Sequence, residues 1–434
     1  MSAAETLKSK IEQRTARVGV IGLGYVGLPL AVEFAAAGFH VTGFDVDASK
    51  VASVNAGRSY IGDVAEAHLA EVVRAGRLDA TADMAKLVDM DVIDICVPTP
   101  LNKTRDPDLS FVVMAVDAVK ARLRKGQLII LESTTYPGTT DEVVQPALEE
   151  GGLVAGTDFF LAFSPERVDP GNEKFNTKTI PKVVGGMNPA STDLAKSFYG
   201  SVIDHVVPVS STRVAEMVKL LENTFRAVNI GLVNELALMS NRMDLDVWEV
   251  IDAAGTKPFG FMPFYPGPGL GGHCIPIDPF YLSWKARQSG FECRFIELAG
   301  QINGSMPAFV VERVGEALNT RKKAINGSRV HVFGVAYKKD VNDMRESPAL
   351  DVMELLERRG AVLSYTDPYV PVLKHGDLDL VSIPEDKAGE GVDIAVICTN
   401  HSVFNYAAMP GRFPLVLDTR NALKGTEAEN LFRL

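Results

Sequence analysis

The chain has 434 residues, 46% of them hydrophobic and 23% charged, which is typical of a globular protein with two or three domains. Its formal net charge of −11 argues against a nucleic-acid-binding protein, because such proteins need a basic face. Residues 1–17 lack the apolar core of a signal peptide, and no segment reaches the ~18 uninterrupted apolar residues of a membrane span. The four cysteines show neither metal-ligand nor disulfide-framework spacing, so we expect a cytoplasmic protein with no metal site.

A glycine-rich turn follows the first predicted strand, residues 18–21. Gly22, Gly24 and Gly27 have GxGxxG spacing, and a predicted helix at 28–37 leads to a strand at 41–45 that ends in Asp45. The first glycine permits the tight turn, the second lets the backbone approach a pyrophosphate, and the third lets helix and strand pack closely. The acid would bind ribose hydroxyls and repel a 2′-phosphate. The pattern therefore predicts an NAD site, the alternative being a glycine turn without a ligand.

Polar residues follow the next predicted strands. Thr99, Thr134 and Glu166 come after the apolar runs 91–97, 127–131 and 159–163. Ligands of open α/β sheets gather at the carboxyl ends of strands, so these residues are candidate site residues, although each alone could be a turn former. Thr139 and Glu142 have the spacing of a capping box for the next helix.

A long helix is predicted over residues 211–243, where apolar residues recur three and four positions apart. Such a helix suits a connection between two domains or a dimer interface. Lys219 and Asn223 are four residues apart and share one face. They are either site residues or part of a solvated flank.

A second α/β half begins near residue 329. Its predicted strands at 330–334, 362–367 and 392–399 mirror those of the first half, but the glycine fingerprint is missing, so we expect the fold without the dinucleotide site. Lys338, Lys339 and Arg345 suit an anionic partner such as a phosphate, or else form a solvated loop. The predicted fold class is α/β, with two Rossmann-like doubly wound domains joined by a long central helix. The expected boundaries are 1–210, 211–325 and 326–434.

Between the halves, residues 258–272 are rich in glycine, proline and aromatic residues and form no regular element. They lead directly to Cys274, with Asp278 four residues further on. A nucleophilic thiol beside an NAD site indicates oxidation past the aldehyde, through a covalent thiohemiacetal and a thioester. The alternative is a buried, inert cysteine, which is the usual state of a lone one.

These segments together resemble the nucleotide-sugar 6-dehydrogenases, the family of UDP-glucose and UDP-N-acetylhexosamine dehydrogenases. The resemblance runs from Val18 to Arg420, and the order and spacing of its motifs are specific. The stretches that carry it are residues 22–28, 132–134, 164–167, 219–223, 271–278 and 338–347.

The resemblance implies a role for each matched residue. Cys274 would be the nucleophile, and Lys219, aided by Asn223, would hold the C6 oxygen and stabilise oxyanions. Asp278 and Thr134 would order or activate water, and Glu166 would assist proton transfer. The implied NAD contacts are Gly22, Gly24, Tyr25, Val26, Gly27, Asp45, Lys50, Thr99, Thr134 and Arg345. The implied UDP-sugar contacts are Glu166, Arg167, Lys219, Asn223, Tyr265, Gly267, Gly271, Lys338 and Arg420.

The stretch from Phe259 to Asp278, with residues 163–172, is most similar to the UDP-N-acetylglucosamine 6-dehydrogenase branch. Many UDP-glucose enzymes carry a lysine where this chain has Ile277. The resemblance therefore implies four-electron oxidation of UDP-N-acetyl-D-glucosamine at C6 for surface polysaccharide synthesis, with UDP-N-acetylmannosamine and UDP-glucose as alternatives. Two other hypotheses are a two-electron β-hydroxyacid dehydrogenase, which would need no cysteine, and a non-catalytic nucleotide-sugar sensor. We expect a homodimer or a higher homo-oligomer through the central helix, and neither a membrane nor a nucleic-acid partner.

Overall fold

The computed structural model describes residues 2–62, 64–102, 106–168, 177–272 and 275–434. The chain forms two compact units, each with its own sheet and its own hydrophobic core. The first comprises Met1–Glu222 and Phe280–Gly290, and the second comprises Asn223–Pro279 and Phe291–Leu434. Among the described residues, no helix is both long enough and apolar enough to cross a bilayer.

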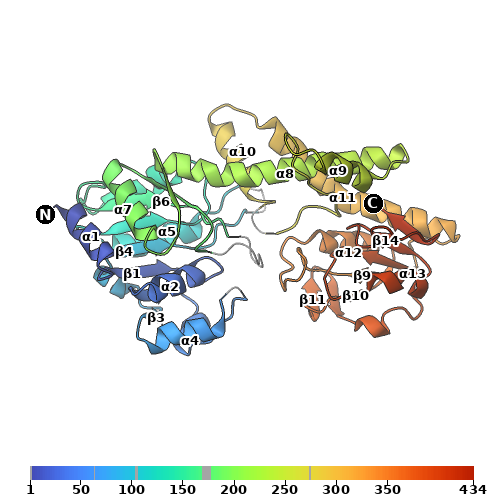
Figure 1. Cartoon of the computed structure of the whole chain (residues 1–434), viewed down its shortest axis with the longest axis horizontal. Coiled ribbons are helices and arrows are strands. Elements are labelled where there is room, and N and C mark those ends of the chain that lie inside the picture. The colour runs from blue at the N-terminus through green and yellow to red at the C-terminus, as the bar shows by residue number, and fades with distance from the viewer. Residues whose placement is uncertain (1, 63, 103–105, 169–176, 273–274) are drawn as a thin grey trace. The chain divides into compact units, whose positions relative to one another are not determined.

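In the described part of the chain, the first unit is built on an eight-stranded sheet with the order β3-β2-β1-β4-β5-β6-β7-β8 (Figure 1). The strands pair in parallel except at β6–β7. The chain moves outward from β1 in one direction and resumes at β4 in the other, which creates the switch point where α/β sheets bind ligands. The strands are β1 (Arg17–Ile21), β2 (His40–Phe44), β3 (Leu78–Thr81), β4 (Val92–Ile95), β5 (Leu128–Leu131), β6 (Phe160–Phe163), β7 (Lys182–Gly186) and β8 (Val206–Val209).

Helices cover both faces of this sheet. Along β5, Leu128 and Ile130 belong to one buried core while Ile129 and Leu131 belong to another, because successive side chains of a strand point to opposite faces. The first core includes side chains of α2, α4 and α7, and the second includes side chains of α5 and α6. The predicted doubly wound fold is confirmed for this unit. Its helices are α1 (Ala3–Glu12), α2 (Gly27–Ala36), α3 (Ala48–Asn55), α4 (Glu66–Arg74), α5 (Ser110–Lys120), α6 (Gln145–Glu149) and α7 (Pro189–Tyr199).

The predicted long helix is α8 (Thr212–Arg242), and the boundary between the two units falls within it. The expected capping box at Thr139 and Glu142 is wrong. Thr139 has helical backbone angles, and its hydroxyl donates to the Tyr136 carbonyl. The buried carboxylate of Glu216 on α8 instead accepts from the backbone N–H groups of Gly138 and Thr140, at 2.5 and 2.9 Å. Glu216, from a helix distant in sequence, therefore accepts the backbone N–H groups that a local capping side chain was expected to accept.

The second unit contains, among the described residues, a five-stranded parallel sheet of order β10-β9-β13-β14-β15 and a small antiparallel pair (Figure 1). The predicted second Rossmann-like half is confirmed. The strands are β9 (Arg329–Phe333), β10 (Val362–Thr366), β11 (Val372–His375), β12 (Leu378–Val381), β13 (Ile394–Ile397), β14 (Val416–Asp418) and β15 (Leu431–Arg433). The helices are α9 (Val247–Gly255), α11 (Arg294–Thr320), α12 (Pro348–Arg358) and α13 (Met409–Arg412), and α10 (Asp278–Gln288) begins in this unit and continues in the first.

Candidate active site

The glycine turn after β1 has the geometry that a dinucleotide requires. Gly22 has a φ of +93°, and a Cβ there would lie 2.5 Å from the carbonyl oxygen of Cys96. A Cβ on Gly27 would lie 1.9 Å from the carbonyl oxygen of Gly22, so both positions exclude a side chain. A Cβ on Gly24 would meet nothing within 4 Å, which leaves that face of the turn open to a ligand. The turn leads into the N-terminus of α2, whose N–H groups suit phosphate.

Asp45 closes this turn at the end of β2. Its side chain is 7% exposed, and its Oδ2 accepts from the backbone N–H of Leu23 at 2.9 Å. Oδ1 accepts from the N–H of Asp47 at 2.9 Å, and the Lys50 ammonium lies 3.3 Å from Oδ2. The structure therefore brings two predicted NAD contacts, Asp45 and Lys50, together at the fingerprint turn. This arrangement fits the ribose end of an NAD molecule.

Other predicted NAD contacts follow strand ends of the same sheet. The Thr99 carbonyl accepts from the hydroxyl of Tyr281 on α10 at 2.9 Å, and Thr134 is half-buried in the loop after β5. Tyr25 is 43% exposed within the fingerprint turn, next to Val26. Arg345 lies in the second unit, where its guanidinium pairs with Asp343 at 2.6 Å.

Glu166 follows β6, and its Oε1 accepts from the backbone N–H groups of Arg167 and Val168 at 2.7 and 2.5 Å. Burial on its own raises the pKa of Glu166. The positive charge of Lys182, a hydrogen bond with Glu132, the Val168 N–H and the charge of Lys219 outweigh burial, so the pKa lies below its ordinary value. Glu166 is therefore a carboxylate at neutral pH. Arg167 pairs with Glu222 of α8 at 2.5 Å.

Two candidate catalytic residues of the second unit are in contact. The side-chain amide of Asn223 donates to Oδ2 of Asp278, the first residue of α10, and Asp278 is 3% exposed. Lys219 lies one turn before Asn223 on α8 and is largely buried, which excludes the solvated-flank alternative. Cys274, the predicted nucleophile, lies outside the described residues.

The predicted sugar-binding loop packs closely against other residues of the second unit. A Cβ on Gly267 would lie 2.6 Å from the Nη1 atom of Arg420, whose Nε donates to the Cys398 carbonyl at 2.9 Å. A Cβ on Gly271 would lie 2.9 Å from Cδ of Pro348 at the start of α12. The loop backbone therefore packs where side chains do not fit, and Gly267 lies beside Arg420.

Sequence reasoning missed the side chains that fix this loop. Oδ1 of buried Asn234 on α8 accepts from the Gly267 N–H at 3.1 Å, and its amide donates to Asn303 of α11 at 2.8 Å. The hydroxyl of Tyr265 donates to Asp252 of α9 at 2.8 Å, and its ring stacks on Trp248 with centroids 5.8 Å apart. The available signal was Asn234 itself, a polar residue within an apolar helix pattern.

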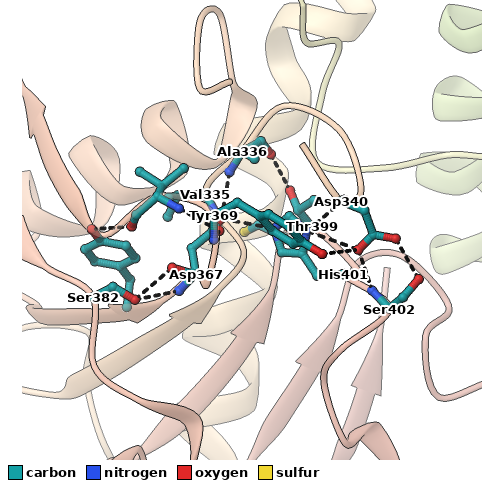
Figure 2. Close-up of polar contacts among 12 residues, drawn as sticks. Val335, Ala336, Asp340, Asp367, Tyr369, Ser382, Thr399, His401 and Ser402 are labelled. Carbon is teal, nitrogen blue, oxygen red and sulfur yellow. Dashed lines mark hydrogen bonds and ion pairs between the residues drawn. The ribbon is translucent and has the colours of Figure 1, made fainter. Parts of the chain in front are cut away.

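In the second unit, the turn after β9 is occupied by the protein's own side chains (Figure 2). Oδ2 of Asp367 accepts from the N–H groups of Val335 and Ala336 at 2.7 and 3.0 Å, and it lies 3.0 Å from Nε2 of His401. This acid occupies the position that Asp45 has in the first unit. The Asp367 carboxylate thus binds two N–H groups of the turn and a buried histidine, whereas Asp45 binds one N–H group of its turn and lies beside Lys50.

The same network anchors the loop that carries Lys338. On one side, the Thr399 hydroxyl donates to the Ala336 carbonyl at 2.6 Å. On the other, the Asp340 N–H donates to Nδ1 of buried His401 at 2.9 Å, and the Asp340 carboxylate accepts from Ser402 (Figure 2). Lys338 is half-buried between these two anchors.

The chain matches three domains of one family along nearly its whole length. They are the NAD binding domain of the UDP-glucose/GDP-mannose dehydrogenase family over residues 16–203, the central domain over 213–305 and the UDP binding domain over 331–425.

Individual relatives agree with this match. The chain is 38% identical over 393 residues to UDP-N-acetyl-D-glucosamine 6-dehydrogenase of Pseudomonas aeruginosa, covering 89% of this chain and 91% of that protein. It is 36% identical over 423 residues to UDP-N-acetyl-D-mannosamine dehydrogenase of Pyrococcus horikoshii, covering 96% and 98%. A solved structure of UDP-D-ManNAc dehydrogenase from Pyrococcus horikoshii superimposes with a TM-score of 0.89 at 34% identity, covering 96% of this chain and 98% of that one. The chain therefore belongs to the UDP-glucose/GDP-mannose dehydrogenase family of NAD-dependent UDP-sugar dehydrogenases.

Proposed function

We propose that this enzyme oxidises C6 of UDP-N-acetyl-D-glucosamine to a carboxylate in two successive oxidations, and that the product serves surface polysaccharide synthesis. The observation that carries the proposal is the buried pair of Asn223 and Asp278, whose side chains share a hydrogen bond. Asp278 lies four residues after Cys274, and together with Lys219 and Asn223 it would supply the donors and the acid that four-electron chemistry needs. A two-electron hydroxyacid dehydrogenase would not need the cysteine.

The NAD site of the proposal is the glycine turn with Asp45 and Lys50, whose open face at Gly24 suits a pyrophosphate. When bound there, NAD would supply the hydride acceptor that each oxidation at C6 needs. In the first step, the C6 hydroxyl gives up its proton to water as the hydride leaves C6, and the Lys219 ammonium stabilises the negative charge that develops on the C6 oxygen.

The second half of the reaction takes place on Cys274. The Cys274 thiolate adds to the C6 aldehyde and forms a thiohemiacetal, and loss of a second hydride from that carbon gives a thioester. Water held by Asp278 and Thr134 attacks the thioester, Glu166 accepts the proton of that water, and the thiolate leaves with the C–S bond pair. The bond from Asn223 fixes the Asp278 carboxylate for this role.

UDP recognition is assigned to the second unit. Arg420 and Lys338 supply positive charge for the nucleotide end, and the loop from Tyr265 to Gly271 surrounds the sugar and diphosphate. The stacking of Tyr265 on Trp248 and the bond from Gly267 to Asn234 support a preformed loop, which lowers the cost of ordering it on binding.

UDP-N-acetylmannosamine is the second candidate substrate, because relatives of comparable identity bear that name. Its acetyl group lies on the opposite face of the sugar, so the two substrates differ in which part of the loop the acetyl methyl meets. An apolar contact of this size discriminates by ~1–3 kcal/mol, which predicts a preference rather than an absolute choice.

We also propose that α8 pairs with a second copy of the chain. Its large apolar side chains Leu221, Phe225 and Leu232 are 56%, 49% and 52% exposed, and such patches commonly mark interfaces. Mass measurement in solution tests this directly, with a dimer or larger species expected for the wild type and a monomer for Leu221→Glu/Leu232→Glu. A monomeric wild type would contradict it.

The experiment that tests the substrate assignment is an assay of the purified enzyme with NAD and a panel of UDP-sugars. We expect the highest kcat/KM with UDP-N-acetyl-D-glucosamine. A higher value with UDP-N-acetylmannosamine or UDP-glucose would overturn the assignment of the sugar and leave the family assignment unchanged.

A further inference from the structure

A buried group of charged side chains lies behind Glu166 in the first unit. Asp94 of β4, Glu132 after β5 and Lys182 of β7 are 0%, 1% and 4% exposed. Tyr199 at the end of α7 is fully buried with them. The group therefore spans neighbouring strands of the sheet, at the edge where the parallel strands end.

Lys182 occupies this edge because β7 runs antiparallel to β6. The N-terminal end of β7 thus lies beside the C-terminal ends of the parallel strands. From there the Lys182 ammonium bonds Oε1 of Glu132 and lies 3.5 Å from Oε2 of Glu166. Oε2 of Glu132 accepts from the Tyr199 hydroxyl at 2.5 Å, and that hydroxyl lies 3.2 Å from Oδ2 of Asp94.

The charges of the group are unequal. One ammonium, that of Lys182, pairs with Glu132 and Glu166 and acts on Asp94 only through its charge. Oδ1 of Asp94 is buried with no hydrogen-bond partner among the described residues. Burial raises the pKa of Asp94 to about 6 and that of Glu132 well above its ordinary value, whereas the pKa of Glu166 is lowered. The inner carboxyl groups therefore hold protons more readily than Glu166 does. The remaining titratable groups facing this site are the Cys96 thiol, whose pKa burial raises, and Lys219 of α8.

We propose that Lys182, anchored by Glu132, is a positioning residue for Glu166, and that its ammonium keeps the Glu166 carboxylate charged and oriented to accept a proton in the reaction. The inference rests on the catalytic role proposed above for Glu166. It extends that role to two residues that do not touch the substrate.

The contacts favour this role over a purely structural ion pair. If Lys182 served only to pair with Glu132, its ammonium would not need to lie within 3.5 Å of Glu166, whose side chain is 14% exposed. The backbone N–H groups of Arg167 and Val168 hold Oε1 of Glu166, while Lys182 faces Oε2. Both oxygens are thus fixed from the protein side, as expected of a base that must keep one orientation.

The test compares the pH dependence of kcat in a set of variants. Lys182→Gln removes the charge and Lys182→Arg keeps it. The double variant Glu132→Gln/Lys182→Gln removes Lys182 together with the acid that bonds it, so Glu132 is not left as an unpaired buried carboxylate if the single variant does not fold. Asp91→Asn is the matched control. Asp91 is also a buried acid with cationic partners, Lys10 and Arg124, but it lies just before β4, whereas Asp94 lies within that strand.

We expect Lys182→Gln, or the double variant, to move the acid limb of the kcat profile up by about one pH unit or more, because the base loses its stabilising charge. At pH 7 the Glu166 carboxyl group would still be ionised, so the expected fall in kcat of about tenfold would come from the lost orientation of that carboxylate. KM for the UDP-sugar should change less than about threefold, and Lys182→Arg should recover most of the loss. Asp91→Asn should lose stability but keep the wild-type profile. A folded charge-removing variant with the wild-type acid limb would overturn the inference.

Glu166→Gln, measured in parallel, separates the two proposals. If it is inactive and Lys182→Gln keeps the wild-type profile, only the positioning role fails. If it turns over at the wild-type rate, the catalytic role of Glu166 fails, and the positioning role fails with it. The wild type gives an independent check that needs no variant, because its kcat should stay level down to about pH 5. An acid limb above pH 6 that Glu166→Gln abolishes would contradict the inference.

Discussion

The carboxylate of Asp45 accepts a hydrogen bond from the backbone N–H of Leu23 at 2.9 Å and so fixes the acid inside the fingerprint turn. In the second unit, Asp367 accepts the equivalent bond from the N–H of Val335 at 2.7 Å, and the same carboxylate oxygen also contacts Nε2 of His401. The same pattern, a strand that ends in an acid beside a turn, thus gives a turn with open space at Gly24 in the first unit and a turn whose acid contacts a buried histidine in the second.

We predict that the enzyme prefers NAD to NADP, because the Asp45 carboxylate would face a 2′-phosphate. Asp45→Ala should raise KM for NAD and reduce the discrimination, since Lys50 would then lose its partner and be available to a phosphate. Asp47→Ala is the control, because Asp47 caps α3 through Ser49 and should not alter the discrimination. Steady-state kinetics with both cofactors checks this, and equal kcat/KM values in the wild type would contradict it.

The second prediction concerns Lys219. Lys219→Ala should lower kcat about 100-fold with a much smaller effect on KM, since the proposed charge stabilisation is greatest in the transition state. Arg226→Ala, an exposed cation on the same helix, should leave both constants unchanged. If Lys219→Ala raised KM and left kcat intact, Lys219 would be a binding residue instead.

The third prediction concerns stability and pH. Burial raises the pKa of Glu216 from 4.5 to about 7, although three hydrogen bonds from Gly138 and Thr140 oppose the shift. A carboxyl group with a raised pKa in the folded state contributes most below its unfolded pKa. That contribution, ~3 kcal/mol, is lost as the pH rises from about 4.5 through about 7.

Glu216→Gln removes this titration. The difference in Tm between wild type and variant should therefore fall as the pH rises from 5 to 8, and Glu235→Gln, an exposed acid on the same helix, should show no such change. A Tm difference for Glu216→Gln that is constant across this range would show that Glu216 does not titrate there.

The fourth prediction concerns the loop that we assign to the sugar. Gly267→Ala places a methyl group 2.6 Å from the Arg420 guanidinium, so we expect a higher KM for the UDP-sugar and an unchanged KM for NAD. Gly304→Ala is the control, because a Cβ there meets nothing within 4 Å. Equal KM values in the two variants would remove Arg420 from the proposed site.

The residues that could be predicted from sequence are those whose roles depend on local geometry. Gly22 is required by the tight turn, and Gly27 is required by the close contact of the helix with that turn. Both requirements arise within a segment of six residues. The long helix and both doubly wound sheets follow from the periodicity of apolar residues, which burial on one or both faces dictates.

The missed residues depend on contacts between distant segments. Lys182 begins a strand, and only the antiparallel direction of β7 brings it to the ligand edge. Asn234 reaches Gly267 because α8 packs on α11 through Asn303, a pairing across 69 residues. The expected cap at Thr139 was displaced by Glu216 for the same reason. Apart from Asn234, a polar residue within an apolar helix pattern, none of these residues leaves a local signal in the sequence.

The central claim is four-electron oxidation through Cys274, and the yield of NADH per UDP-sugar tests it most directly. With limiting UDP-N-acetyl-D-glucosamine and excess NAD, we predict two NADH per sugar and a uronic acid product. Cys274→Ala should lose most of this turnover, because no thioester can form. One NADH per sugar in the wild type, or near-normal acid production by Cys274→Ala, would contradict the account.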